Sequence, residues 1–234
     1  MPIIILITLA LIPFRAIVLS LMQHYHQHVL SKKHPINPEP TRTAQEKNER
    51  KTLWLGLCVD SLALCCFITL GIFKLNDFSW SGIGIILLSH ALVVEPLYYG
   101  IHRLYHTPLG MKWLHKDHHY STTTQPQTAI SFYWVERLLY TAIFTPPFLI
   151  ASLLGVLSLE LCIGYILFID ILNIWGHFNV ELTPKWWRHS VLKYIIYSPS
   201  YHTVHHRHPG KNLSLFMPIW DTVFKTNNIH HPKN

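Results

Sequence analysis

Charged side chains are scarce in this sequence. Only 13% of the 234 residues are Asp, Glu, Lys or Arg, whereas a typical soluble domain has about 25%. Half of the residues are hydrophobic, so the deficit indicates a membrane protein rather than a soluble domain with a large core. The formal net charge of +7 does not indicate a nucleic-acid partner, because the basic residues lie in short segments between apolar runs, where a membrane surface accounts for them.

Several catalytic signatures are also missing. The sequence has no HExxH run for a zinc hydrolase, no GxSxG run for a serine nucleophile and no GxGxxG run for a nicotinamide cofactor. The four cysteines show no CxxC spacing, so neither disulfide bonds nor a zinc ribbon is indicated. Any reducing equivalents that the protein uses are therefore expected to come from another protein.

Histidine is abundant instead, and three clusters of it lie just outside apolar runs. They are His102 with His106, then His115, His118 and His119, and finally His202, His205 and His206. Residues three or four apart share one face of a helix, so each cluster can aim at least two imidazoles at one point. In each HxxHH run the adjacent pair lies roughly 100° apart around the axis, so one ring of that pair can turn to a neighbouring ion. Eight imidazoles exceed the four ligands of a tetrahedral zinc and suit two ions, and iron, copper and zinc all accept imidazole.

The apolar runs predict an all-α, multi-pass membrane fold with about four to five spans. The runs cover residues 2–22, 53–73, 82–99, 138–157 and 159–175. The first lacks a small-residue cleavage site and is expected to be a retained helix rather than a signal peptide. Runs 53–73 and 82–99 should form one helical hairpin. Runs 138–157 and 159–175 should form a second around Gly155, with Pro146 and Pro147 kinking or interrupting its first arm.

The polar stretch 23–52 sets the expected orientation. Its prolines at 35, 38 and 40 predict an irregular loop, with His24, His26 and His28 at a solvated edge. Because it is short and basic, the positive-inside bias places it in the cytoplasm. The two hairpins then bring all three clusters, together with His177, to a cytoplasmic helical cap that holds a di-metal site. Ser198 and Pro199 should begin the helix of the third cluster.

Polar residues inside the apolar runs are expected to face other helices. Asp60 should face a neighbouring helix, and His90 should be a hydrogen-bonded interior histidine. Glu95 and Asp170 each precede a histidine, His102 and His177, by seven residues. They are candidates for orienting an imidazole from another helix, with a helix-to-helix hydrogen bond as the alternative. The tail with His230 and His231 is expected to be a frayed end.

From Glu95 to Thr226 the sequence resembles the fatty acid hydroxylase/sterol desaturase superfamily of membrane di-iron oxygenases. The resemblance rests on the three clusters and on three flanking runs, residues 98–103, 200–206 and 212–226. Residues 176–182 and the Ser-Leu-Phe-Met-Pro string at 214–218 are similar to the plant cuticular-wax aldehyde decarbonylase branch. We therefore expect one integral membrane domain over residues 1–234, with its histidine-box core at about 95–226.

The resemblance implies two iron ions, with molecular oxygen as co-substrate and a lipid as substrate. The implied iron ligands are His102, His106, His115, His118, His119, His177, His202, His205 and His206. The sequence departs from the family pattern at three places: Asn173 stands where many members have a histidine, Glu95 where an aspartate is usual, and Phe132-Tyr133 where a His-Pro pair precedes Glu136. Asn173 thus joins Glu95 and Asp170 as a candidate neighbour of the metal ligands, and one iron is expected to have an amide or water in place of that histidine.

The expected activity is hydroxylation or desaturation of a fatty acid, sterol or related lipid. Electrons would come from a cytochrome b5- or ferredoxin-type reductase system. The site would face the cytoplasm from the endoplasmic reticulum in a eukaryote, or from the inner membrane in a bacterium. A long-chain aldehyde decarbonylase is the alternative within the same class. A metal-binding or metal-transporting membrane protein is the alternative outside it, although a transporter should place its histidines near the bilayer midplane.

Overall fold

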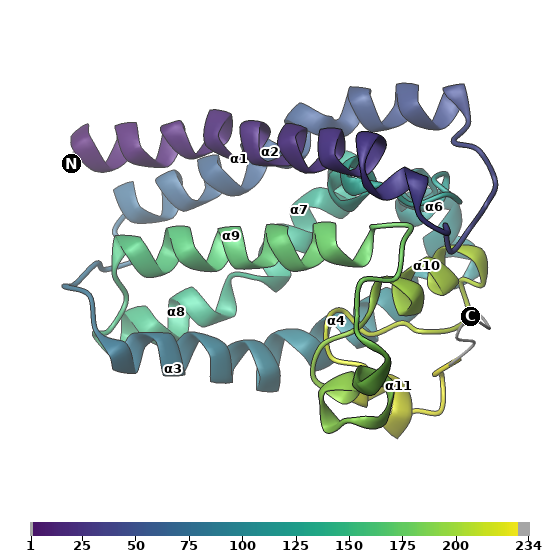
Figure 1. The fold of residues 1–234 in the computed structure, drawn as a ribbon. Coiled ribbons are helices and arrows are strands. Elements are labelled where there is room, and N and C mark those ends of the chain that lie inside the picture. The colour runs from purple at the N-terminus through teal and green to yellow at the C-terminus, as the bar shows by residue number, and fades with distance from the viewer. Residues whose placement is uncertain (1, 229–234) are drawn as a thin grey trace.

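A computed structural model describes residues 2–228, and the long elements in this range are all α-helices (Figure 1). The long helices are α1 (Pro2–His28), α2 (Thr43–Thr69), α3 (Trp80–Ser89), α4 (Glu95–Tyr105), α7 (Trp134–Ile143), α8 (Pro146–Leu153), α9 (Leu159–Gly176) and α10 (Pro199–Arg207). Shorter helices are α5 (Pro108–Gly110), α6 (Lys116–His119) and α11 (Ile219–Val223). Short 3-10 or π turns occupy Leu30–Lys32, His90–Val94, Met111–His115, Pro126–Ile130, Lys185–His189 and Val191–Tyr194. The tail with His230 and His231 lies outside the described residues.

Four helical stretches in residues 2–228 are long and apolar enough to cross a membrane. They are Pro2–Lys32, Thr43–Thr69, Trp80–Tyr105 and Leu159–Gly176. The third is one continuous rod in which a π turn joins α3 to α4. Pro96 has no N–H to donate to the preceding turn, which accounts for the wider turn just before it. The predicted all-α, multi-pass membrane fold is therefore confirmed.

The run 138–157 is not one continuous helix, and none of the four candidate spans includes it. The chain forms two short helices there, α7 and α8, with a break at Phe144 and Thr145. Pro146 lies in the first turn of α8, where a backbone N–H would have no acceptor within the helix, so its absence loses no hydrogen bond. The same residue cannot continue the preceding helix, which therefore ends. The interruption expected from the two prolines is thus confirmed. The hairpin turn beyond α8 contains Gly155 at φ +68°, a left-handed conformation that favours glycine.

The prediction that residues 23–52 form a loop is wrong at both ends. Helix α1 continues to His28, and α2 begins at Thr43, so its first three turns come from the expected loop. The three prolines end at position 40, and the helix-forming residues that follow begin α2 immediately. His24 and His28 therefore lie on one face of α1, with ring centroids 4.2 Å apart, rather than on a loop edge.

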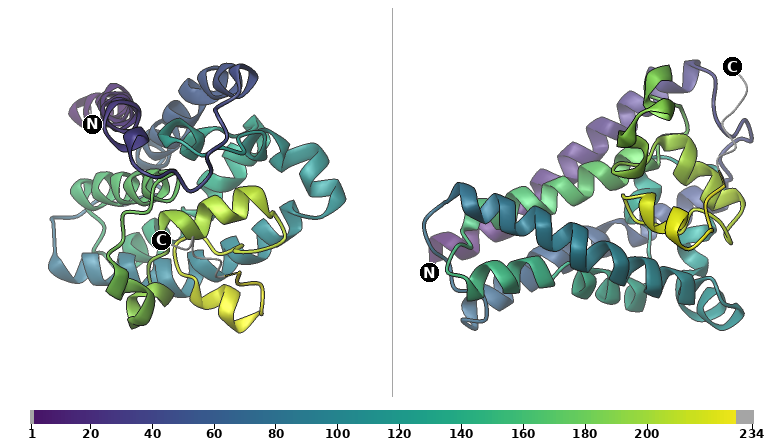
Figure 2. Two further views of the ribbon diagram at one scale, coloured as in Figure 1. Left: turned by 45° about the vertical axis from the view of Figure 1, so that its right-hand side comes forward. Right: turned by 90° about the horizontal axis from the view of Figure 1, so that it is seen from below.

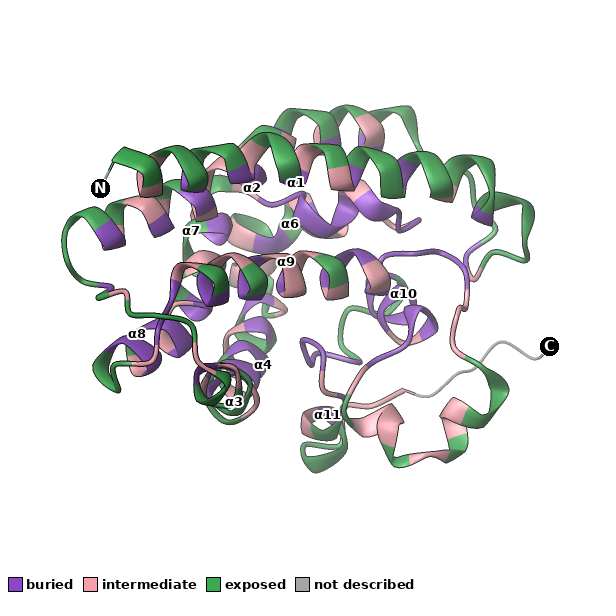
Figure 3. Cartoon of the chain, turned by 60° about the vertical axis from the view of Figure 1, so that its left-hand side comes forward, coloured by how far each residue is buried: buried purple, intermediate pink, exposed green. Residues whose placement is uncertain are grey.

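The long helices lie alongside one another, and the short helices gather at one end of them (Figures 1 and 2). That end holds α6, α10 and α11 together with the end of α4, while the N-terminus of α1 lies at the opposite end. The outward faces of α1, α2 and α3 are exposed (Figure 3). Those faces carry apolar side chains such as Ile3, Leu6, Ile17, Leu62 and Leu87, as lipid-facing surfaces of spanning helices do.

Candidate metal centre

The histidines come from four places at the short-helix end of the molecule. The end of α4 carries the first cluster, the π turn before α6 and α6 itself carry the second, and α10 carries the third. His177 follows the last residue of α9. The side chain of Ser198 accepts a hydrogen bond from the Tyr201 N–H, 3.2 Å away, and Pro199 opens the helix. The predicted start of the third cluster's helix is confirmed.

The structure gathers all nine predicted histidines into two groups. Group A consists of His102, His106, His115, His119 and His205, and group B consists of His118, His177, His202 and His206. Within each group the potential ligand nitrogens all lie within 4.8 Å of one another. Each HxxHH run divides in the same way: the first and last histidines stay together, and the middle one turns to the other group. This division agrees with the helical spacing in the sequence.

Group B contains a pair of unprotonated nitrogens that face each other. The ring N–H of His177 at Nδ1 donates to the Asn173 carbonyl over 2.7 Å, and that of His206 donates to the Ser121 carbonyl over 3.0 Å. A neutral imidazole carries one proton, so both Nε2 atoms are bare, yet they lie 3.2 Å apart. Two lone pairs this close repel unless a cation lies beside both. Ligands bound at about 2.1 Å and at right angles around one ion would be separated by roughly 3.0 Å.

Group A repeats this arrangement. His102 and His205 donate from Nδ1 to the carbonyls of Leu213 and Lys211, over 2.7 and 2.8 Å. Their Nε2 atoms lie 3.0 Å from those of His115 and His119, respectively. A backbone carbonyl that fixes the tautomer and direction of a ring in this way is the usual support of a metal-bound histidine. Both groups therefore fit a metal ion by geometry and by donor chemistry.

Burial keeps these rings in the form that binds metals. It lowers the pKa of His177 and His205 to about 4. For His115, His118 and His202 burial comes first and neighbouring imidazoles second, and together they hold the pKa well below its usual value. The rings are therefore neutral near pH 7, as metal ligation requires.

Glu136 is a site residue to which sequence reasoning gave no role. It projects from α7, and its Oε1 lies 2.5 Å from Nδ1 of His115. Its side chain is only 2% exposed, and burial raises the pKa of this carboxyl well above the usual range. A carboxylate on the far nitrogen of a metal-bound imidazole orients the ring and makes it a stronger ligand. The available signal was an acidic residue on the buried face of an amphipathic helix.

We expect Glu136→Gln to weaken metal binding by roughly 10–100-fold, the usual effect of losing such a partner. The amide keeps the shape of the side chain but cannot become the carboxylate that strengthens His115 as a ligand. Competition with a chelator of known affinity would measure the change in iron(II) affinity. Glu160→Gln, at an exposed carboxylate in the first turn of α9, is the matched control. Equal affinity in the two variants would contradict this role.

Within residues 2–228, neither Glu95 nor Asp170 is hydrogen-bonded to a histidine of group A or group B. Glu95 accepts hydrogen bonds from His90 Nε2 and from the backbone N–H groups of Phe216 and Met217, each 3.1 Å away. His90 also bonds the Tyr165 hydroxyl at 2.8 Å, so the prediction of a hydrogen-bonded interior histidine is confirmed. The bonds from Phe216 and Met217 join the start of α4 to the segment that precedes α11, so Glu95 orients no ligand imidazole, and they are not the helix-to-helix hydrogen bond that was the alternative.

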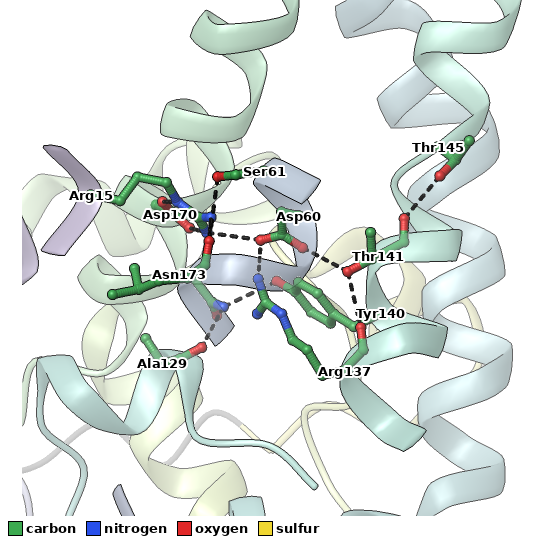
Figure 4. Close-up of polar contacts among 11 residues, drawn as sticks. Arg15, Asp60, Ser61, Ala129, Arg137, Tyr140, Thr141, Thr145, Asp170 and Asn173 are labelled. Atoms are coloured by element: carbon green, nitrogen blue, oxygen red, sulfur yellow. Dashed lines mark hydrogen bonds and ion pairs between the residues drawn. The ribbon is translucent and has the colours of Figure 1, made fainter. Parts of the chain in front are cut away.

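Asp170 belongs to a separate ion-pair network (Figure 4). Its carboxylate binds Arg15 of α1, at 2.6 and 2.9 Å, so its expected role beside a metal ligand is wrong. Asp60 joins the same network, as expected of a residue that faces a neighbouring helix. The Asn173 amide donates to the Ala129 carbonyl and to the Tyr140 hydroxyl, over 2.8 and 3.0 Å. This amide is therefore engaged away from group B, and Asn173 supports the site through the carbonyl that accepts from His177.

Comparison with known proteins agrees with this centre. The family model described as fatty acid hydroxylase matches residues 87–226, which include all nine histidines. The chain therefore belongs to the fatty acid hydroxylase family. No solved structure matches the chain.

Among curated relatives, the chain is similar to plant proteins. It is 42% identical over 151 residues to Protein CER1-like 1 of Arabidopsis thaliana. It is 38% identical over 148 residues to Very-long-chain aldehyde decarbonylase GL1-5 of Oryza sativa subsp. indica. These matches cover 63% and 62% of this chain but 24% of each relative, so the chain spans about a quarter of their length.

Proposed function

We propose that the protein is a di-iron oxidoreductase that uses molecular oxygen to hydroxylate or desaturate a lipid. The observation that carries this proposal is the pair of adjacent all-imidazole groups, each with bare nitrogens turned inward. Nitrogen ligation without thiolates suits a metal that changes redox state. Two irons, held by group A and group B, would supply oxygen activation and the breaking of a C–H bond. The chain's own part is to orient the rings, keep them neutral and exclude water.

The apolar side of group B supports a lipid substrate. The ring of His118 stacks on Phe132, with centroids 4.8 Å apart, and Phe132 packs on Tyr140 at 5.0 Å. Tyr140 in turn lines a cavity of ≈ 40 Å³ among α2, α7, α8 and α9. Its lining is mostly apolar, with Phe148 and Tyr165, but also includes the charged residues Asp60, Arg137 and Asp170. That volume holds a few waters at most, so a long acyl chain would enter by parting these helices from the bilayer side.

Decarbonylation of a long-chain aldehyde is the second candidate function. It is favoured by the names of the rice relatives, although the match covers only 24% and 23% of their length. The three reactions leave different products. Hydroxylation adds an oxygen atom, desaturation removes two hydrogens, and decarbonylation shortens the chain by its carbonyl carbon.

We further propose that the metal centre faces the cytoplasm and receives electrons from a cytochrome b5- or ferredoxin-type reductase system. The membrane would be the endoplasmic reticulum in a eukaryote or the inner membrane in a bacterium. The connection between α1 and α2, which contains Lys32 and Lys33, lies at the end of the molecule that holds the histidines (Figure 1), and Lys47 follows in the first turns of α2. This placement supports a cytoplasmic site through the positive-inside bias.

Labelled oxygen gas tests the proposed reaction. The protein, reconstituted in lipid bilayers with iron(II) and a reductase system, should consume oxygen and convert a lipid only when both oxygen and reductant are present. In hydroxylation one labelled atom enters the lipid and the other is reduced to water, with two electrons and two protons supplied by the donor. In desaturation both labelled atoms appear in water. Lipid turnover without oxygen and reductant would refute the proposal, and a hydrocarbon one carbon shorter than an added aldehyde would favour the second candidate.

A further inference from the structure

Glu49 of α2 is a buried carboxylate without a cationic partner. Its residue is only 1% exposed, and none of the ion pairs within residues 2–228 includes it. Neutral groups bond it instead: Ser121 Oγ at 2.7 Å, Thr128 Oγ1 at 2.6 Å, Gln45 Nε2 at 3.0 Å and the Gln125 amide. A buried charge is tolerated only where hydrogen bonds replace its hydration. Three of the four donors belong to one segment, residues 121–131.

Segment 121–131 carries the carbonyls that orient two ligands of group B. The Ser121 carbonyl accepts from His206 Nδ1 at 3.0 Å, and the Ser131 carbonyl accepts from His118 Nδ1 at 3.2 Å. The segment contains only a short 3-10 turn, Pro126–Ile130. Its backbone is therefore positioned by the side chains that hold it rather than by a regular helix.

A third ligand of group B depends on the same segment through one intermediate residue. The Ala129 carbonyl accepts from the Asn173 amide at 2.8 Å, and the Asn173 carbonyl accepts from His177 Nδ1 at 2.7 Å. Group A relies on other parts of the chain, because the carbonyls of Leu213 and Lys211 orient two of its rings. Movement of segment 121–131 would therefore disturb group B selectively.

Helix α2 also holds the far end of the segment. Thr52, one turn after Glu49, lies with its hydroxyl 2.9 Å from the hydroxyl of Ser131. Gln45, one turn before Glu49, donates to the Thr123 carbonyl over 2.8 Å. One face of α2 thus fixes both ends of the segment, with the only charged group of that face at its centre.

We propose that Glu49 is a positioning residue for the group B metal. It acts through segment 121–131, whose carbonyls set the tautomer and direction of His206, His118 and, through Asn173, His177. This inference rests on the proposed function, because it requires that group B binds a metal. It assigns a specific task to the first turns of α2, which precede the part of the chain matched by the family.

The test is the number of metal ions bound by the purified full chain, titrated with cobalt(II) as a spectroscopic substitute for iron(II). Glu49→Gln should weaken one of two binding events by roughly 10–100-fold and leave the other unchanged. The spectrum of the remaining ion should match that of His202→Ala, which removes a group B ring, and not that of His106→Ala, which removes a group A ring. Thr52→Val should act in the same direction and less strongly, which keeps the test decisive if Glu49→Gln fails to fold.

Glu46→Gln is the matched control, because Glu46 lies on the same helix and its side chain forms an ion pair with the exposed Arg50, at 3.2 Å. It should retain both binding events. Two unchanged events in both Glu49→Gln and Thr52→Val would overturn the proposal. So would a loss of both ions in proportion to a loss of folded protein, since that result assigns Glu49 a general structural role. A wild-type chain that binds no metal would instead refute the proposed function.

Discussion

His202→Ala should remove one metal ion and leave the other, and His106→Ala should remove the other one. The two residues belong to different groups, B and A, so each substitution deprives only one ion of a ligand. In residues 2–228 neither ring has a hydrogen-bond partner at Nδ1, so truncation leaves no carbonyl unpaired. Turnover should fall by more than about 100-fold in both variants. Loss of a residue that is only hydrogen-bonded to a metal ligand usually costs no more than about 100-fold, and loss of the ligand itself should cost more.

Iron content per folded chain, with lipid turnover measured in parallel, would test this expectation. His24→Ala is the control, because His24 is an exposed histidine on α1 and belongs to neither group. It should keep both ions and full turnover. If either ligand variant released both ions, the two groups would act as one cooperative site, and their division would have no functional meaning.

The sequence predicted how the histidines within one run are arranged, but not which runs come together to form each group. Helical periodicity indicates that one ring of the adjacent pair, His118 or His119, binds with His115 while the other turns to a second ion, because that relation depends only on residues per turn. The structure shows that His118 is the one that turns away. Periodicity does not indicate that His205 of α10 completes the group of His102 in α4. That contact depends on how distant helices pack, and no local pattern in the chain records it.

Errors in the sequence reasoning have the same physical origin. The seven-residue spacing places Asp170 on the face of His177, but its actual partner, Arg15, lies 155 residues earlier in the chain. The sequence reasoning gave Glu49 no role because the nearby prolines suggested a loop. The prolines end at Pro40, however, and helix-forming residues follow. For Asp170 the sequence indicated the correct face of the helix, and for Glu49 it indicated the wrong helix boundary. In both cases only the tertiary structure identified the residues that the carboxylate contacts.

Arg15 offers the largest expected effect on stability. It lies midway along α1, is only 2% exposed, and binds Asp170, Asp60 and the Leu57 carbonyl (Figure 4). Arg137 of α7 also donates to Asp60, so two cations balance two anions. The network joins α1 and α2, which precede the matched range 87–226, to α7 and α9 within it.

Arg15→Met should reduce the free energy of unfolding by about 3–5 kcal/mol, the usual cost of removing one partner of a buried pair. Within residues 2–228 the only side chain that pairs with Asp170 is that of Arg15, so the substitution leaves a carboxylate inside the bundle without a cation. Asp60 keeps Arg137 and the Thr141 hydroxyl. The loss should therefore come mainly from Asp170 rather than from the whole network.

The double variant Arg15→Met/Asp170→Leu separates these contributions. Replacing a buried ion pair by apolar residues of similar volume is often neutral, so the second substitution should restore most of the stability lost in the first. Unfolding in mixed micelles with increasing amounts of denaturing detergent would measure the free energy of unfolding of the wild type, of Arg15→Met and of the double variant. Arg50→Met, at an exposed pair with Glu46, is the control and should cost less than about 1 kcal/mol. A double variant as unstable as Arg15→Met would show that the guanidinium contributes through packing against α2 and α9, and not through the charge of Asp170.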